Sequence, residues 1–154
     1  MKVYLVQHAE AKPEEVDPDR PLSAKGRDDI EAVAAQAAQM NLTVAEIRHS
    51  GKLRAQQTAE ILGAALKPDQ GVNQASGLGP VDDVHPAAEA LDSASAPLVL
   101  VGHLPFMARM AGLLVAGNAD FPVVKIQNAA LICLEKAEQG WQVSWILTPE
   151  MATC

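Results

Sequence analysis

The fold is decided by the stretch VYLVQHA at residues 3–9. Its first four residues are apolar β-formers in a continuous run, which is typical of a strand covered on both faces in a largely parallel sheet. His8 stands where this strand ends and a polar loop begins. Ligands of open α/β sheets bind beyond the carboxyl ends of the strands, so His8 is a candidate functional residue.

Two more buried strands are predicted at residues 44–49 and 98–101, and they end at Ser50 and just before His103. The carboxyl ends of parallel strands meet at one edge of a sheet. We therefore expect His8, Ser50 and His103 to gather at this edge, with the two histidines facing each other across a pocket.

Apolar residues recur at helical spacing in three other segments. One segment runs from residue 23 to residue 40, with Asn41 as its stop, and another begins at Pro105. The third follows Ser50, a candidate N-cap, and carries Arg54 in its first turn. This placement brings an arginine to the edge where the histidines are expected.

The remaining sequence supplies a loop region and a hairpin. Residues 67–97 are rich in Gly, Pro, Asp and Ser, with one short helical patch at 87–91. Residues 129–135 and 141–147 are rich in β-formers and predict an antiparallel hairpin. Period two places four hairpin residues on one face: Trp141, Val143, Trp145 and Leu147. Alternating strands and helices closed by a hairpin predict one domain over residues 1–154, a three-layer α/β/α sandwich with a mostly parallel mixed sheet.

Composition excludes several partner classes. The chain has 154 residues, 49% of them hydrophobic, and a formal net charge of −7, which opposes nucleic acid or an anionic membrane as a partner. An anionic substrate must then be held by a few local cations. The only cysteines, Cys133 and Cys154, favour reduced thiols, and no apolar run approaches the ~18 residues of a membrane span. These features predict a cytoplasmic protein.

Four motifs occur in order along the chain: LVQHAEA at 5–11, RPLS at 20–23 followed by Gly26, SGKLRAQQT at 50–58 and VGHLP at 101–105. Together they resemble the histidine phosphatase superfamily, specifically its short SixA-type phosphohistidine phosphatases. The match extends over nearly the whole chain. It implies a phosphoglycerate mutase-like fold.

The resemblance also implies roles for individual residues. His8 would be the nucleophile and His103 the second pocket histidine, while Arg54 would bind phosphate and Arg20 would border the pocket. The chemistry suits these residue types, because a neutral imidazole can attack phosphorus and leave again. A guanidinium fork matches the equatorial oxygens of a phosphoryl group. No metal or other cofactor is needed for this reaction.

One position departs from the family pattern, which has an arginine where this chain has Gln7. The phosphate-binding set is then Gln7, Arg20 and Arg54. Glutamine donates hydrogen bonds but supplies no charge, and losing a charge-assisted hydrogen bond costs roughly 1.5–3 kcal/mol. The sequence therefore predicts a site that is weakened and still active.

No carboxylic acid in the 66–98 stretch stands out as a general acid, and Asp82, Asp83 and His85 are only candidates. An alkoxide leaving group needs such an acid, whereas the imidazole of phosphohistidine can be protonated by solvent near neutral pH. The predicted substrate is thus phosphohistidine on another protein. The resemblance adds a histidine phosphotransfer domain as a partner.

Three other interpretations compete with this one. A non-catalytic phosphoryl-binding module is favoured by Gln7, and a phosphomonoesterase or mutase acting on small sugar phosphates would require a carboxylic acid near His8. A zinc site at His49 and His85 lacks tight ligand spacing. Phosphate release from a phosphohistidine protein would separate an enzyme from a binding module.

Overall fold

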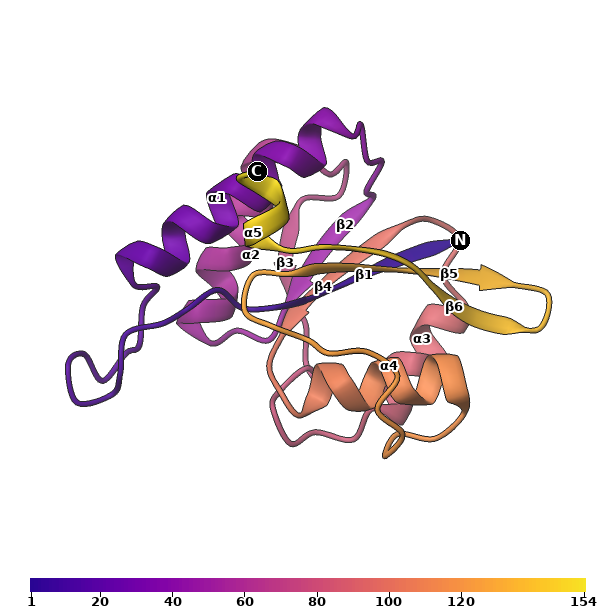
Figure 1. Ribbon diagram of the computed structural model, residues 1–154. Coiled ribbons are helices and arrows are strands. Elements are labelled where there is room, and N and C mark those ends of the chain that lie inside the picture. Colours follow the sequence, from indigo (N-terminus) through magenta and orange to yellow (C-terminus); the bar gives the residue numbers. More distant parts are fainter.

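The computed structural model describes residues 1–154 and contains a six-stranded sheet in the order β3-β2-β4-β1-β5-β6 (Figure 1). The elements in chain order are β1 (Lys2–Gln7), α1 (Ala24–Gln39), β2 (Glu46–His49), α2 (Leu53–Leu66), β3 (Val72–Gln74), α3 (His85–Asp92), β4 (Leu98–Gly102), α4 (Phe106–Ala116), β5 (Leu131–Ala137), β6 (Gly140–Leu147) and α5 (Pro149–Ala152). Four strands, β3, β2, β4 and β1, pair in parallel, and β5 and β6 add an antiparallel hairpin beside β1. The predicted mixed α/β sandwich is confirmed.

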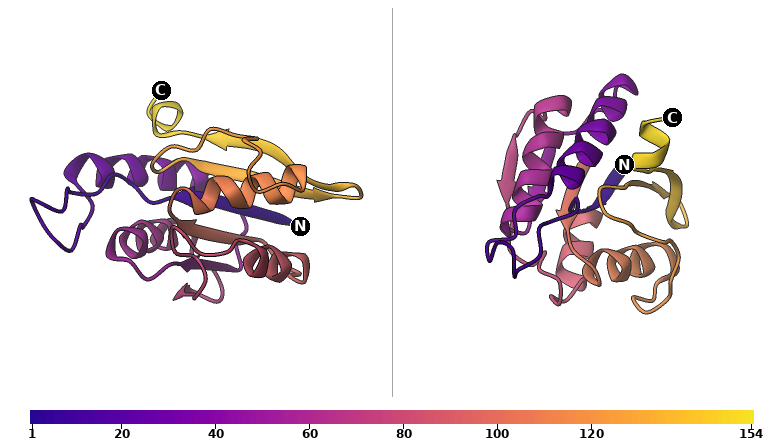
Figure 2. Two further views of the ribbon diagram at one scale, coloured as in Figure 1. Left: turned by 90° about the horizontal axis from the view of Figure 1, so that it is seen from below. Right: turned by 60° about the vertical axis from the view of Figure 1, so that its left-hand side comes forward.

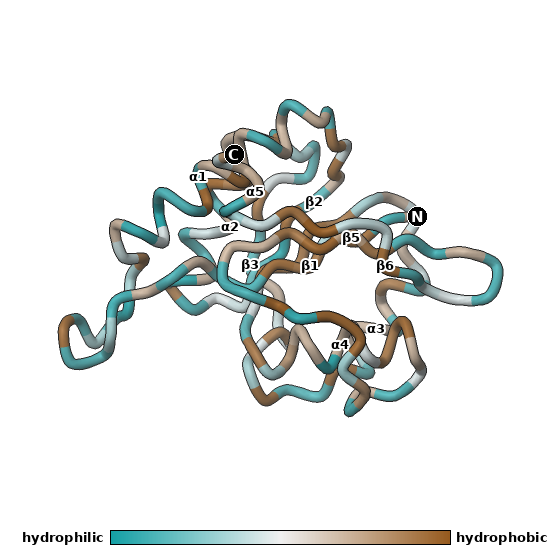
Figure 3. Tube along the Cα trace, in the orientation of Figure 1, coloured by the Kyte–Doolittle hydropathy of each residue, from teal (hydrophilic) through white to brown (hydrophobic).

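Helices cover both faces of this sheet. The right-hand view of Figure 2 shows α1 and α2 on one side and α3 and α4 on the other. Tyr4 and Val6 of β1 pack toward α1 and α2, whereas Val3 and Leu5 pack toward α3 and α4. The continuous apolar run at the start of the chain is therefore buried on both faces, as a parallel strand requires. Figure 3 shows this hydrophobic stretch of β1 passing through the centre of the molecule.

The start of α1 holds the first loop close to the helix. Ser23 is the N-cap residue of α1, where the predicted segment begins, and its hydroxyl accepts a hydrogen bond from the Gly26 amide at 3.0 Å. A Cβ atom on Gly26 would lie 2.0 Å from the carbonyl oxygen of Glu10. Only glycine lets the helix approach the chain that leaves β1 so closely. This contact fixes the path of the loop that follows His8.

The predicted cap of α2 is wrong. Lys52, not Ser50, is the N-cap residue of α2, and the Ser50 hydroxyl contacts a histidine instead. The helix predicted from Pro105 begins one residue later, at Phe106, with Pro105 as its N-cap. The loop-rich stretch 67–97 contains the short strand β3 as well as α3, which extends beyond the predicted patch at both ends.

The predicted common face of the hairpin is also wrong. Cys133 pairs with Trp145, but the next residue, Leu134, pairs with Val143, so β6 carries a bulge. An extra residue in one strand moves the following side chains to the opposite face. Trp141 accordingly packs toward α3 and α4, whereas Trp145 packs on the α1 and α2 side.

The helices are too short or too polar for a bilayer crossing: none reaches the length and hydropathy that a membrane span needs.

Candidate active site

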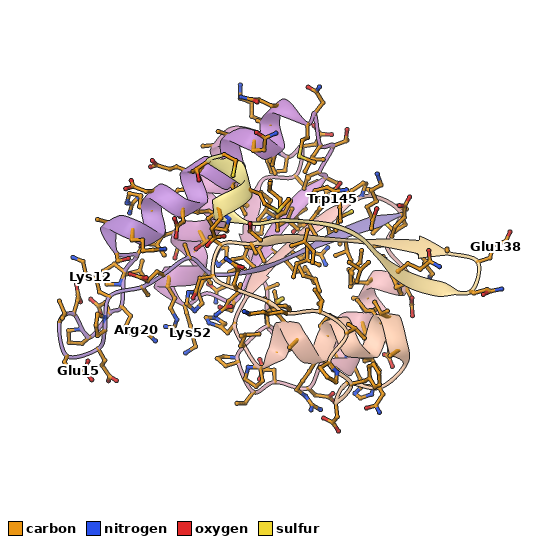
Figure 4. The ribbon with its side chains drawn as sticks, viewed as in Figure 1. Lys12, Glu15, Arg20, Lys52, Glu138 and Trp145 are labelled. Carbon is orange, nitrogen blue, oxygen red and sulfur yellow. The ribbon has the colours of Figure 1, made fainter.

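Three parallel strands end beside one another at one end of the molecule. His8 follows β1, Ser50 follows β2 and His103 follows β4, at adjacent positions in the order of the sheet. Figure 4 shows Arg20 and Lys52 at this end and Glu138, at the tip of the hairpin, at the opposite end. The topology of the sheet thus places the candidate residues on a single edge.

The two histidines face each other at this edge. The ring centroids of His8 and His103 are 5.2 Å apart, and the ring planes are inclined by 53°. Only 9% of His8 and 2% of His103 is exposed to solvent. A pair of imidazoles this close, and this buried, cannot easily carry two positive charges.

Burial is the main reason that the pKa values of both histidines are low. Burial lowers the pKa of His8 to about 4, with the Arg54 and Arg20 charges acting in the same direction and a hydrogen bond to the Ala9 carbonyl opposing them. Burial also lowers the pKa of His103 to about 3, followed by the effects of His8, Arg54, Lys52 and Arg20. Both imidazoles are consequently neutral at pH 7.

The hydrogen bond of His8 identifies its tautomer. The Nδ1 atom lies 2.7 Å from the carbonyl oxygen of Ala9. A carbonyl oxygen only accepts hydrogen bonds, so Nδ1 carries the proton. Nε2 of the neutral ring then keeps its lone pair. His8 is in the form that a nucleophile requires.

His103 is held by a different kind of contact. The Ser50 hydroxyl oxygen lies 2.6 Å from Nε2 of His103, although the two residues are 53 positions apart in sequence. Nδ1 of His103 is buried without a hydrogen-bond partner. The sequence placed Ser50 and His103 at the same edge but predicted a helix cap as the role of the Ser50 hydroxyl, so the hydrogen bond between the two residues was missed.

Arg54 supplies a second buried nitrogen atom without a partner. Its side chain starts in the first turn of α2, and its Nε atom makes no hydrogen bond in the protein. Burial, and then the Arg20 charge, lowers the pKa of Arg54. A buried donor left unpaired costs about 1–3 kcal/mol, a cost that a bound anion removes.

Arg20 and Lys52 extend the positive charge around the histidines. Arg20 has a φ of 49°, which is uncommon for a residue other than glycine, and its Nε donates to the Lys12 carbonyl at 3.1 Å. All the charged groups that shift the pKa values of His8 and His103 are cationic, and no carboxylate is among them. The edge is electropositive in a protein of net charge −7.

Backbone contacts from distant segments fix the position of His8. Its amide donates to the Gly102 carbonyl at 2.9 Å, and its carbonyl accepts from the side-chain amide of Asn128 at 2.8 Å. The Ala9 amide donates to the Thr58 hydroxyl, which in turn donates to the Arg54 carbonyl. Thr58 lies in a motif of the sequence, but nothing in the local sequence singles out Asn128.

Gln7 is the last residue of β1 and pairs with Gly102 of β4. Its carbonyl accepts a hydrogen bond from the Ala129 amide, and the residue is half-buried. Gln7 therefore lies directly before His8 at the end of β1.

The three candidate acids, Asp82, Asp83 and His85, form hydrogen bonds within their own loop and not with the two histidines of the site. The Asp82 carboxylate accepts from the Gly79 amide, and Asp83 binds the imidazole of His85. None of them affects the pKa of His8 or His103. No group of three or more His, Cys, Asp or Glu side chains gathers to form a metal site.

Comparison with known proteins agrees with this arrangement. The family model described as Histidine phosphatase superfamily (branch 1) matches residues 3–79, which contain His8 and Arg54. An uncharacterized protein of Picosynechococcus sp. is 37% identical over 142 residues, covering 87% of this chain and 84% of the relative.

Solved structures share the fold at lower identity. The tungstate complex of the protein histidine phosphatase SixA is 22% identical with a TM-score of 0.85, and the alignment covers 97% of each chain. A phosphoserine phosphatase variant from Entamoeba histolytica, in complex with phosphoserine, is 14% identical with a TM-score of 0.71, covering 97% of this chain and 98% of that one. The phosphoglycerate mutase-like fold predicted from the motifs is thereby confirmed.

Proposed function

This chain belongs to the histidine phosphatase superfamily, and from that premise we propose that it is a phosphohistidine phosphatase that forms a covalent intermediate on His8. One observation carries the proposal: the neutral imidazoles of His8 and His103 face each other beside the unpartnered Nε of Arg54. A phosphoryl group bound next to the two rings would meet a nucleophile, Nε2 of His8, and unpaired nitrogen atoms of His103 and Arg54.

In the first step, Nε2 of His8 attacks phosphorus. The new Nε2–P bond forms as the P–N bond to the substrate imidazole breaks, and the departing imidazole takes a proton from solvent. Phosphorylation of Nε2 leaves His8 with a positive charge because Nδ1 keeps its proton. The Ala9 carbonyl, 2.7 Å from Nδ1, stabilises that charge.

In the second step, water attacks phosphorus and the P–Nε2 bond breaks. The electron pair of that bond returns to Nε2, so His8 becomes neutral again, and the oxygen and both protons of the water leave with the product as dihydrogen phosphate, which can release one proton to solvent. Arg54 and His103 act mainly by placing positive or hydrogen-bonding groups near the equatorial oxygens, which is the dominant form of catalysis in phosphoryl transfer. Arg20 and Gln7 border this group of residues.

The substrate class follows from the groups that surround His8. An alkyl phosphate releases a strongly basic alkoxide, which a general acid must protonate. The charged groups that act on His8 and His103 are cations, and Asp82 and Asp83 bind within their own loop. These contacts favour a P–N bond over a P–O bond. The substrate we propose is a phosphorylated histidine on another protein, such as a histidine phosphotransfer domain.

The test combines trapping with substrate comparison. The protein is mixed with a phosphohistidine-carrying phosphotransfer domain labelled with ³²P and quenched within milliseconds. The expected product is a labelled enzyme whose phosphoryl group is stable in base, labile in acid and located on His8. In steady state, kcat/KM for the phosphohistidine protein should exceed that for an alkyl phosphate by at least about tenfold.

Two results would contradict the proposal. Tight binding of the phosphorylated domain without phosphate release would identify a binding module, the alternative that Gln7 favours. Equal or faster hydrolysis of an alkyl phosphate would identify a phosphomonoesterase, and a proton donor for its leaving group would then have to come from a residue such as Asp82.

A further inference from the structure

Four of the twelve Lys and Arg side chains form an ion pair with a carboxylate, and Arg20, Lys52 and Arg54 at the candidate active site are not among the four. The ion pairs of the chain involve Lys25, Arg48, Arg109, Lys136 and the imidazole of His85. Lys52 has no carboxylate partner and is exposed at the edge of the sheet, as Figure 4 shows. The motifs that identified Arg54 assign no role to this lysine.

We propose that Lys52 is a phosphoryl-binding residue that supplies the positive charge missing at Gln7. This inference rests on the proposed function and deepens it by naming a further residue that binds the substrate anion. It concerns binding of the phosphoryl group and assigns no proton transfer to Lys52.

The local geometry ties Lys52 to the site. Its amide lies 3.4 Å from the Ser50 hydroxyl, and that hydroxyl is 2.6 Å from Nε2 of His103. Lys52 is also the N-cap residue of α2, two positions before Arg54. Its backbone is thus fixed beside His103, while its flexible four-carbon side chain is free to turn toward an anion.

The electrostatic balance of the site supports the same role. Lys52 is close enough to His103 to lower the pKa of that imidazole, together with Arg54 and Arg20. The family pattern expects an arginine at position 7, where Gln7 contributes hydrogen bonds without charge. Lys52 restores one unit of positive charge at the same edge. As a point charge it attracts the anion without the two-pronged geometry of an arginine.

The experiment measures binding of inorganic vanadate, a phosphate mimic, to the full-length protein. Lys52→Met removes the charge and keeps much of the apolar stem, and it should weaken vanadate binding by about three- to tenfold. Lys52→Arg should restore most of the affinity. In turnover of a phosphohistidine protein, Lys52→Met should raise KM more than it lowers kcat, because Lys52 binds the anion in the ground state as well.

Lys67 provides the matched control. It is exposed and lies at the other end of the same helix, about 20 Å away. Its φ of 50° is left-handed, a conformation that asparagine tolerates. Lys67→Asn therefore removes the same charge without straining the backbone, and it should leave vanadate affinity unchanged. An equal loss in both variants would indicate a general charge effect and overturn the proposal.

A double variant tests the compensation directly. Gln7→Arg should strengthen vanadate binding, and in that background Lys52→Met should have a smaller effect than in the wild type. If the wild type binds vanadate but Lys52→Met binds it equally well, the role of Lys52 is wrong while the proposed function stands. If the wild type neither binds vanadate nor releases phosphate, the proposed function fails and this inference fails with it.

Discussion

The ends of β1 and β4 are alike in position but different in chemistry. The two strands are parallel neighbours, Gln7 pairs with Gly102, and each strand is followed by a buried histidine. Nδ1 of His8 donates a hydrogen bond to the carbonyl of the next residue, Ala9. His103 instead contacts Ser50, which follows β2, through Nε2, and its Nδ1 has no hydrogen-bond partner. A local hydrogen bond fixes the tautomer of one ring, and a long-range contact fixes the position of the other.

This difference assigns different tasks to the two rings. His8 presents a lone pair at Nε2, which suits attack on phosphorus. Lys52 lowers the pKa of His103 in addition to Arg54 and Arg20, whereas Arg54 and Arg20 alone are the cations that act on His8. We therefore expect the oxygens of the phosphoryl group to lie toward His103 and its phosphorus to lie toward His8.

The largest expected effect separates the two rings by kinetics. His8→Ala should lower kcat for a phosphohistidine protein by at least about 10⁴-fold, because it removes the covalent nucleophile. His103→Ala should lower kcat by about 10²- to 10³-fold, a typical cost for one group that stabilises charge in the transition state. Rapid-quench and steady-state kinetics on both variants measure these losses.

The covalent intermediate provides the second readout for the same pair. His103→Ala should still accumulate a phosphorylated enzyme, whereas His8→Ala should not. Circular dichroism should show that both variants are folded, since both side chains lie at the edge of the sheet and outside its two hydrophobic clusters. A folded His8→Ala protein with full activity would remove His8 from the mechanism.

The next effect concerns stability and pH, and it should be shared by the two rings. The folded-state pKa values of about 4 and about 3 both lie below the ordinary value of 6.5. At pH values between the folded-state pKa and 6.5, each histidine is protonated in the unfolded chain but neutral in the folded chain. The free energy of unfolding therefore falls as the pH drops below about 6.5. Each histidine should cost roughly 2 kcal/mol between pH 7 and pH 5.

Urea unfolding at pH 7 and pH 5 measures this loss. His8→Asn and His103→Asn should each show a smaller drop in the free energy of unfolding than the wild type does. Burial also lowers the pKa of His49, but that residue contributes equally to all three proteins. A wild-type drop that neither substitution reduces would mean that the two imidazoles are not neutral in the folded protein.

The strands that position the site were predictable because a short run of consecutive apolar residues is enough to indicate a buried strand. Residues 3–6 and 98–101 are continuous apolar runs, and each is followed by the histidine that the topology then brings to the edge. The ends of α1 were predictable for the same reason, since Ser23 caps a helix that ends beside Asn41. A short and largely exposed strand such as β3 carries no comparable pattern.

What the sequence could not provide depends on pairing between distant residues. The bulge in β6 follows from its register against β5, and it changes which face Trp141 occupies without altering the period-two pattern of the sequence. Asn128 binds the carbonyl of His8 from 120 residues away. Ser50 looked like a helix cap because its partner His103 lies on another strand. Only the assembled sheet brings these partners together.

The smallest expected effect tests whether the Ser50 contact holds His103 in place. Ser50→Ala removes the hydroxyl that lies 2.6 Å from Nε2 and that is the single hydrogen-bond partner of the ring in the protein. A neutral hydrogen bond contributes about 0.5–1.5 kcal/mol, so kcat/KM should fall by about three- to tenfold. The loss should be well below that of His103→Ala, because the imidazole itself remains.

Ser50→Thr keeps a hydroxyl at the same position and serves as the matched control, with activity close to that of the wild type. If Ser50→Ala hydrolyses a phosphohistidine protein as fast as the wild type does, the hydroxyl has no part in positioning His103. The contrast between a locally fixed and a distantly fixed histidine would then have no functional consequence.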